Sequence, residues 1–173
     1  MNQNFEERLT GGKTFSLGNT VEVVQTVLES PETFSEYLEL FSSENSQVVM
    51  RASNGLKRIF DERLQWFSDF KSSVIPLLHQ CPHDSARWTL VQLLKKYKNQ
   101  LSEDELSFAF TVAEQFTLES QEWITLAQSM DLLIKLKKRL DPSPELRNRV
   151  AELADDSRKA VAGKAKKLLE VLP

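Results

Sequence analysis

The sequence predicts an all-α fold of about nine helices arranged as repeats. Strand signals are scarce, because the chain has little sustained alternation of apolar and polar residues and few β-branched runs. Apolar residues recur instead at the three- and four-residue steps of an amphipathic helix. Four of the helices share one spacing and follow one another at intervals near forty residues, which is typical of a helical repeat.

Residues 1–18 are predicted to form a glycine-containing leader ahead of the helices. The leader includes most of "LTGGKTFSLGN" (residues 9–19), which holds three of the five glycines of the chain. Its Gly12-Lys13-Thr14 matches the end of a phosphate-binding loop, but that loop needs Gly-x4-Gly-Lys-Ser/Thr after a buried strand. The first glycine of the motif would stand at position 7, which is Glu7. We therefore expect the glycines to form turns, and we expect no nucleotide or other cofactor.

Caps and stops set the helix boundaries. The first helix follows the polar residues Asn19 and Thr20 and stops at Ser30-Pro31. Pro31 then suits the first turn of a second helix, which extends to about Phe41. The remaining helices are predicted at about 46–60, 62–80, 84–99, 102–118, 121–140, 143–154 and 157–172. We expect residues 19–173 to form a single domain.

The repeat rests on four helices whose apolar or small residues lie on one stripe, in steps of four, four and three. The four stripes are Val48, Ala52, Leu56, Ile59; Ala86, Leu90, Leu94, Tyr97; Thr125, Ser129, Leu133, Leu136; and Ser157, Val161, Ala165, Leu168. A helical hairpin cannot bury its apolar face alone, so neighbouring units are expected to stack. The alternative is a nine-helix globule whose spacing matches by chance.

This pattern is similar to HEAT and armadillo-type repeats. The second helix of a HEAT repeat typically has an Arg ahead of a small residue and Leu, and "ARWTLVQLL" and "SRKAVAGKA" carry Arg87 and Arg158 at that place. The whole chain resembles a group of small bacterial HEAT-like proteins, through "GGKTFSLGNTVEVVQTVL", "VVMRASNGL", "ARWTLVQLL" and "SMDLLIKL". The resemblance implies a HEAT-like α-solenoid, a right-handed α-α superhelix, and it implies no catalytic residue.

Composition and charge limit the partners. The chain is 40% hydrophobic and 27% charged, without an apolar run long enough for a membrane helix, so we expect a cytoplasmic protein with no membrane partner. Its single cysteine, Cys81, cannot form an internal disulfide. The net charge is −3, and duplex nucleic acid usually requires many basic contacts. We therefore do not expect a nucleic-acid partner.

Two polar clusters are candidate sites. The turn "HQCPHD" gathers His79, Cys81 and His83, which are all possible zinc ligands. Their spacing is not that of a structural zinc site and no second cluster completes it, so we expect no metal, with Asp84 capping the next helix. The segments "IKLKKRL" and "GKAKKLL" form a basic cluster that we interpret as a solvated face, because no aromatic residue follows Trp123. The basic residues are Lys135, Lys137, Lys138, Arg139, Lys164, Lys166 and Lys167.

These observations predict a non-catalytic module that binds a protein partner on the concave face, lined by the second helix of each pair. Trp88 lies beside Arg87 and away from the Leu90 stripe, so it is a candidate anchor. The candidate partner-binding residues are Arg51, Asn54, Arg58, Arg87, Trp88, Gln92 and Lys95. One alternative is a HEAT-like DNA alkylpurine glycosylase, which would need a positive face with aromatic residues and a central carboxylate. Another is a structural role through self-association.

Overall fold

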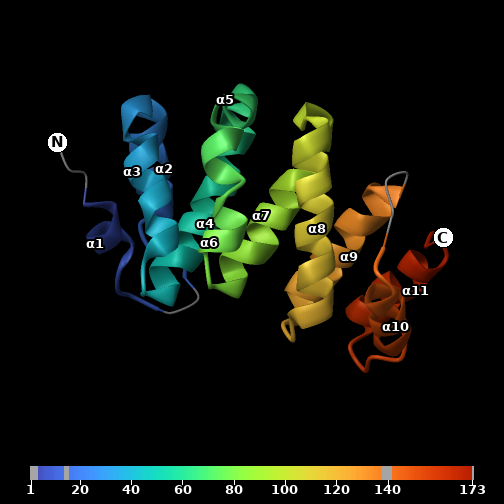
Figure 1. The fold of residues 1–173 in the computed structure, drawn as a ribbon. Coiled ribbons are helices and arrows are strands. Elements are labelled where there is room, and N and C mark those ends of the chain that lie inside the picture. Colours follow the sequence, from blue (N-terminus) through green and yellow to red (C-terminus); the bar gives the residue numbers. More distant parts are fainter. Residues whose placement is uncertain (1–3, 14–15, 138–141, 173) are drawn as a thin grey trace. The chain divides into compact units, whose positions relative to one another are not determined.

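A computed structural model of the protein describes residues 4–13, 16–137 and 142–172. All regular structure in these residues is helical (Figure 1), which confirms the all-α prediction. Contacts between residues divide the chain into two compact units, residues 1–90 and residues 91–173. The single domain expected over residues 19–173 stays a prediction.

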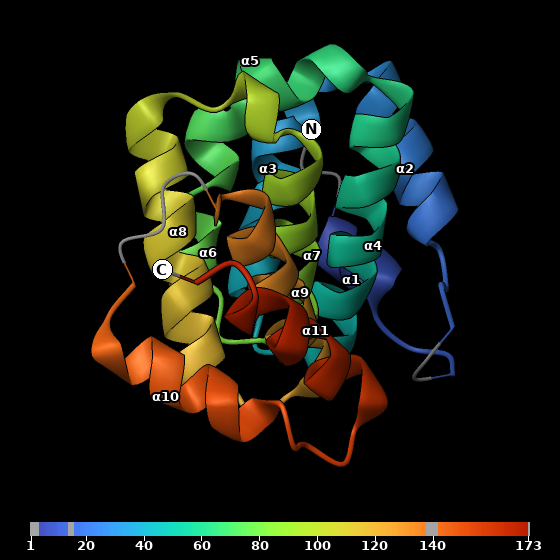
Figure 2. The same cartoon turned by 90° about the vertical axis from the view of Figure 1, so that its right-hand side faces the viewer.

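In the first unit, α1 and α2 both pack against α4, as the blue and teal ribbons of Figure 2 show. Short turns and 3-10 segments connect the helices of this unit. Its elements are α1 (Phe5–Leu9), α2 (Thr20–Glu29), η1 (Pro31–Thr33), α3 (Phe34–Glu39), η2 (Leu40–Ser42), α4 (Ser46–Glu62), α5 (Leu64–Val74), α6 (Leu77–Gln80) and the start of α7 (Asp84–Lys96).

Aromatic side chains fill the centre of the first unit. The Phe34 ring lies 5.9 Å from that of Phe60, 5.8 Å from that of Trp66 and 4.6 Å from that of Phe70, measured between ring centroids. Aromatic pairs at these separations add to the stability that burial alone provides. Phe34 and Phe60 are fully buried, and Trp66 and Phe70 are partly buried.

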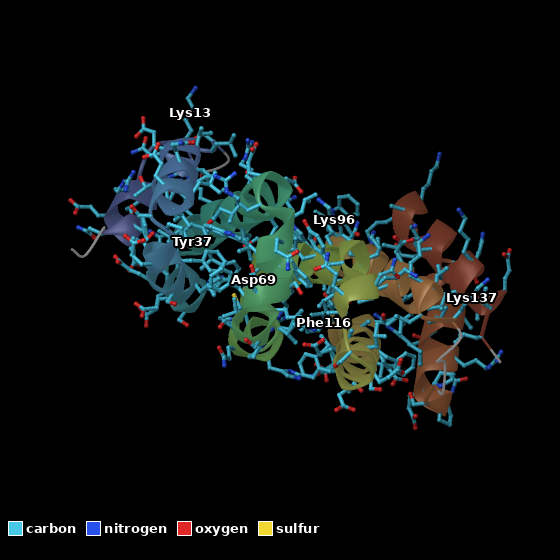
Figure 3. All side chains as sticks on the ribbon, turned by 90° about the horizontal axis from the view of Figure 1, so that it is seen from above. Lys13, Tyr37, Asp69, Lys96, Phe116 and Lys137 are labelled. Carbon is cyan, nitrogen blue, oxygen red and sulfur yellow. The ribbon has the colours of Figure 1, made fainter. Side chains whose placement is uncertain are left out.

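Tyr37 joins α3 to α4 through a buried hydrogen bond, and Figure 3 shows its side chain among those of the first unit. Its hydroxyl donates to the carbonyl of Ala52 at 2.6 Å. A Cβ atom at Gly55 would lie only 2.3 Å from the Tyr37 hydroxyl oxygen, so the close approach requires glycine at this point of α4. Burial raises the pKa of the Tyr37 hydroxyl above its ordinary value, which keeps it protonated as a donor.

In the second unit, α9 packs against both α8 and α11, and α10 packs against α8 and α11. Figure 2 shows α10 running across the lower end of α8. The elements are the end of α7, η3 (Lys98–Gln100), α8 (Glu103–Glu119), α9 (Trp123–Lys135), α10 (Pro144–Leu153) and α11 (Lys159–Leu169). A capping box starts α8: the Ser102 hydroxyl accepts from the Glu105 amide at 3.2 Å, and the Glu105 carboxylate accepts from the Ser102 amide at 2.7 Å.

The predicted stripes form the cores of both units. Fifteen of the sixteen stripe residues are buried, as expected when the apolar face of each helix packs against its neighbours. Ser157 is the exception and is exposed, because α11 begins at Lys159 and leaves Ser157 in the preceding turn.

The structure differs from the prediction in one helix that is divided and one that was missed. The expected helix at 62–80 is divided into α5 and α6, because Pro76 lacks the amide that a continuous helix needs at that point. The polar N-terminus contains a helix that the sequence analysis missed, α1, whose Phe5 and Leu9 are four residues apart and buried.

Candidate functional site

The side chain of Arg51, on α4, lies in the interior of the first unit and is 1% exposed. Its Nε donates to the Ser16 carbonyl at 3.0 Å, and its Nη1 donates to the carbonyls of Leu9 and Gly11 at 2.6 and 2.7 Å. Its Nη2 donates to the Lys13 carbonyl and the Ser16 hydroxyl, both at 3.1 Å. A guanidinium has five N–H donors, and five bonds are formed. The prediction that Arg51 contacts a partner at the surface is therefore wrong, because the leader covers it.

The glycines of the leader allow its backbone to lie close against the Arg51 side chain. Gly11, Gly12 and Gly18 have φ angles of 85°, 73° and 50°, in the left-handed region that side chains disfavour. At Gly18 both the φ angle and the available space disfavour a side chain, since a Cβ atom there would lie 2.7 Å from Cζ of Arg51. The backbone of the leader thus passes directly against the guanidinium.

The polarity of the leader is opposite to that of a phosphate-binding loop. Such a loop turns amide N–H groups toward an anion, whereas this one turns four carbonyl oxygens toward a cation. The Lys13 side chain is exposed and extends away from the ribbon (Figure 3). Thr14, the last residue of the Gly-Lys-Thr match, lies outside the described residues.

No carboxylate among the described residues pairs with Arg51. A buried charge is costly unless hydrogen bonds compensate it, and here main-chain carbonyl dipoles supply that compensation. The positive charge is therefore held in place but not neutralised by an ion pair.

Beside Arg51, a cleft of about 150 Å³ opens within the first unit. We call it the Leu17–Trp88 cleft, after two of the large apolar side chains that line it. Leu17 is 40% exposed and Trp88 is partly exposed. The leader, α4 and the start of α7 provide the lining, which consists of Ser16, Leu17, Met50, Arg51, Asn54, Lys57, Ser85, Trp88 and Thr89.

Of the predicted partner-binding residues, Asn54 and Trp88 line this cleft. Arg58 is exposed one turn along α4 and donates to the Asn54 side-chain oxygen at 2.9 Å. Arg87 is not among the lining residues; it donates to the Cys81 carbonyl at 3.4 Å and forms an ion pair with Asp84 at 3.8 Å. The structure thus separates the sequence neighbours Arg87 and Trp88.

Sequence reasoning missed Leu17 and Lys57. Lys57 follows Asn54 by three residues on α4, so helical spacing alone places both on one face. Leu17 carried a weaker signal, an apolar residue in an otherwise polar and glycine-rich segment, and only the path of the leader brings it to the cleft.

Gln92 and Lys95 belong to the second unit, where Gln92 is partly exposed and Lys95 is already engaged. The Lys95 ammonium donates to Asp131 at 2.6 Å and to Gln128 at 3.0 Å. Lys164, from α11, binds the other oxygen of the Asp131 carboxylate. Lys164 was predicted to belong to a solvated face, and its side chain is 35% exposed while it pairs with Asp131.

Asp131 on α9 therefore links α9 to both α7 and α11. Burial is the largest single influence on the pKa of the Asp131 carboxyl and raises it, but the hydrogen bonds and charges of the two lysines together lower it. Lys135, Lys137, Lys166 and Lys167 are exposed, as expected of the basic cluster. Lys138 and Arg139 lie outside the described residues.

At the turn before α7, Cys81 is buried, and its burial raises the pKa of the thiol. The His83 Nε2 atom lies 3.2 Å from the Ser43 carbonyl oxygen. Over the described ranges, no group of three or more His, Cys, Asp or Glu side chains is placed to share a metal ion. In the same ranges, no helix has the length and apolar character needed to cross a membrane.

A family model described as HEAT repeat domain matches residues 5–120. The match begins at α1 and includes residues 5–18 of the leader, α4 and α7, so every lining residue of the Leu17–Trp88 cleft lies within it. A comparison with curated proteins found no match. A comparison with solved structures also found none.

Proposed function

The chain belongs to the HEAT repeat domain family, and from this premise we propose that it is a non-catalytic scaffold whose first unit binds a protein partner at the Leu17–Trp88 cleft. Helical repeats of this kind commonly present a surface on the second helix of each pair. In the first unit those helices are α4 and the start of α7, which provide most of the cleft lining.

The partly exposed Trp88 is the observation that carries the proposal. Tryptophan is enriched among the residues that contribute most to protein interfaces, because its large ring buries much apolar surface and its N–H can still bind an acceptor. Trp88 lines a hollow beside a second exposed apolar side chain, Leu17. This combination of an aromatic anchor with a neighbouring recess suits the insertion of a partner side chain.

The composition of the lining supports a binding role over catalysis. A glycosylase of the HEAT-like type would use a carboxylate close to aromatic residues on a positive surface. No Asp or Glu is among the residues that line the cleft, so the cleft itself supplies no carboxylate for acid-base chemistry.

Site-specific photo-crosslinking in cells of the source organism tests the proposal. A photoreactive residue at position 88 is expected to capture a defined protein, whereas the same residue at Ser35, which is exposed and outside the cleft, is not. Untagged Trp88→Ala protein should fail to compete for the captured species, while Arg87→Ala protein should compete normally. Equal capture from positions 88 and 35 would contradict the proposal.

A further inference from the structure

The Leu17–Trp88 cleft presents hydrogen-bond donors that have no acceptor. Within the part of the chain that the structure describes, the Lys57 ammonium, the Trp88 indole N–H and the Asn54 side-chain amide donate to no protein atom. The Asn54 side-chain oxygen is different, since Arg58 already donates to it at 2.9 Å. An ammonium and an indole N–H cannot accept hydrogen bonds, so a ligand that matches them must supply acceptors.

The charge of the cleft also favours a ligand that carries hydrogen-bond acceptors. Its lining contains two cations, Arg51 and Lys57, and no carboxylate. The surrounding unit is acidic, with eight Lys or Arg and twelve Asp or Glu in residues 1–90. The cleft is thus a local positive site in a negative unit, which favours one carboxylate and disfavours a polyanion that would also meet the acidic surroundings.

We propose that the Leu17–Trp88 cleft binds an acidic segment of a partner polypeptide. An Asp or Glu carboxylate of the segment accepts hydrogen bonds from Lys57 and from the Trp88 N–H, near the Arg51 guanidinium, whose charge no carboxylate of the described residues neutralises. A neighbouring apolar side chain of the segment packs on Leu17 and on the Trp88 ring. This inference rests on the proposed function and assigns a chemistry to the partner.

A peptide titration followed by NMR tests the assignment. The probe is a short capped peptide in which Asp and Glu alternate with Leu and Phe, and its control carries Asn and Gln at every acidic position. The chain has three tryptophans, so Trp88→Phe assigns the Trp88 indole signal. The acidic peptide is expected to shift that signal saturably and to leave those of Trp66 and Trp123 unchanged, whereas the amide control is not expected to bind.

Variants separate charge recognition from simple apolar docking. Lys57→Gln should weaken binding of the acidic peptide about threefold, as for the loss of a partly exposed ion pair. Lys57→Glu should weaken it about tenfold, because repulsion is added. Arg63→Glu makes the same charge reversal in the same unit at an exposed residue outside the cleft, and it should have little effect. Raising salt from about 0.05 M to about 0.5 M should weaken binding several-fold.

Four results would overturn the acidic assignment. These are equal binding of the amide peptide, equal effects of Lys57→Glu and Arg63→Glu, stronger binding of a single-stranded oligothymidylate, and a Trp88 shift that depends only on protein concentration and so reveals a second copy in the cleft. Failure of the peptide while crosslinking from position 88 persists would reject the acidic chemistry and leave protein binding standing. Loss of crosslinking with intact peptide binding would reject the proposed function instead.

Discussion

Replacing Arg51 by Met is expected to release the leader from α4. The substitution removes five hydrogen bonds, and a net contribution of about 1 kcal/mol for each sets an upper value of about 5 kcal/mol. Water can take the place of the guanidinium when the leader detaches, and burial of the charge no longer has to be compensated. We therefore expect the leader to lose about 3 kcal/mol of attachment free energy.

Limited proteolysis measures this attachment: Arg51 binds the Lys13 carbonyl, so we expect trypsin to cleave after Lys13 mainly when the leader opens. A loss of about 3 kcal/mol should accelerate that cleavage on the order of a hundredfold if opening and closing are fast relative to cleavage. Arg58→Met is the matched control, since Arg58 lies on the same helix, is exposed and makes one side-chain bond to Asn54. Cleavage after Lys13 at the same rate in both variants would refute the conclusion that Arg51 holds the leader.

Four further substitutions test other contacts. Gly18→Ala should destabilise the first unit by about 2 kcal/mol through left-handed strain and the 2.7 Å approach to the guanidinium, whereas Gly163→Ala, whose Cβ atom meets nothing within 4 Å, should stabilise α11 by about 0.5–1 kcal/mol. A melting temperature that rises for Gly18→Ala would contradict the first expectation, and one that falls for Gly163→Ala would contradict the second. Asp131→Asn should cost about 2 kcal/mol at neutral pH and little in strong acid. Its native pKa lies below the ordinary 3.8, so the contribution is complete above that value and is lost as pH falls through the native pKa, which urea unfolding at several pH values would show or refute. Tyr37→Phe should cost about 1–2 kcal/mol, because the Ala52 carbonyl loses its buried donor; an unchanged urea midpoint would contradict this.

The helical stripes could be predicted because they depend on spacing within one helix. Val48, Ala52, Leu56 and Ile59 are all fully buried, and their steps of four and three place them together whatever the neighbouring helix is. The division at Pro76 was also readable from the sequence, since proline removes a helix amide. These features are local, so one sequence is enough to specify them.

The position of Arg51 could not be read in this way. It precedes the stripe residue Ala52 by one position and therefore lies outside the stripe. At such a position the helical spacing predicts a solvent-exposed side chain. A segment about forty residues earlier in the chain covers that position instead. A distant segment without regular structure produces no periodic pattern in the sequence around the residue that it covers. Leu17 was missed for the same reason, because it belongs to that segment.

The link through Asp131 depends on the register between repeats. Lys95 follows the stripe residue Leu94 by one position, and Asp131 follows Ser129 by two. Leu94 is the third residue of its stripe and Ser129 is the second of its own, so the Lys95 and Asp131 side chains meet only through the offset between the helices as they pack. That register is a property of the assembled unit, so sequence spacing suggests neighbours but does not assign the pair.

The leader is held mainly by its main chain, and this leaves its side chains free to change. Of the five bonds from Arg51, four go to carbonyl oxygens that any residue would supply. Positions such as Lys13 and Leu17 can therefore be substituted without loosening the segment, provided the left-handed glycines remain. A protein built in this way can diversify one wall of the Leu17–Trp88 cleft while the anchoring of that wall stays constant.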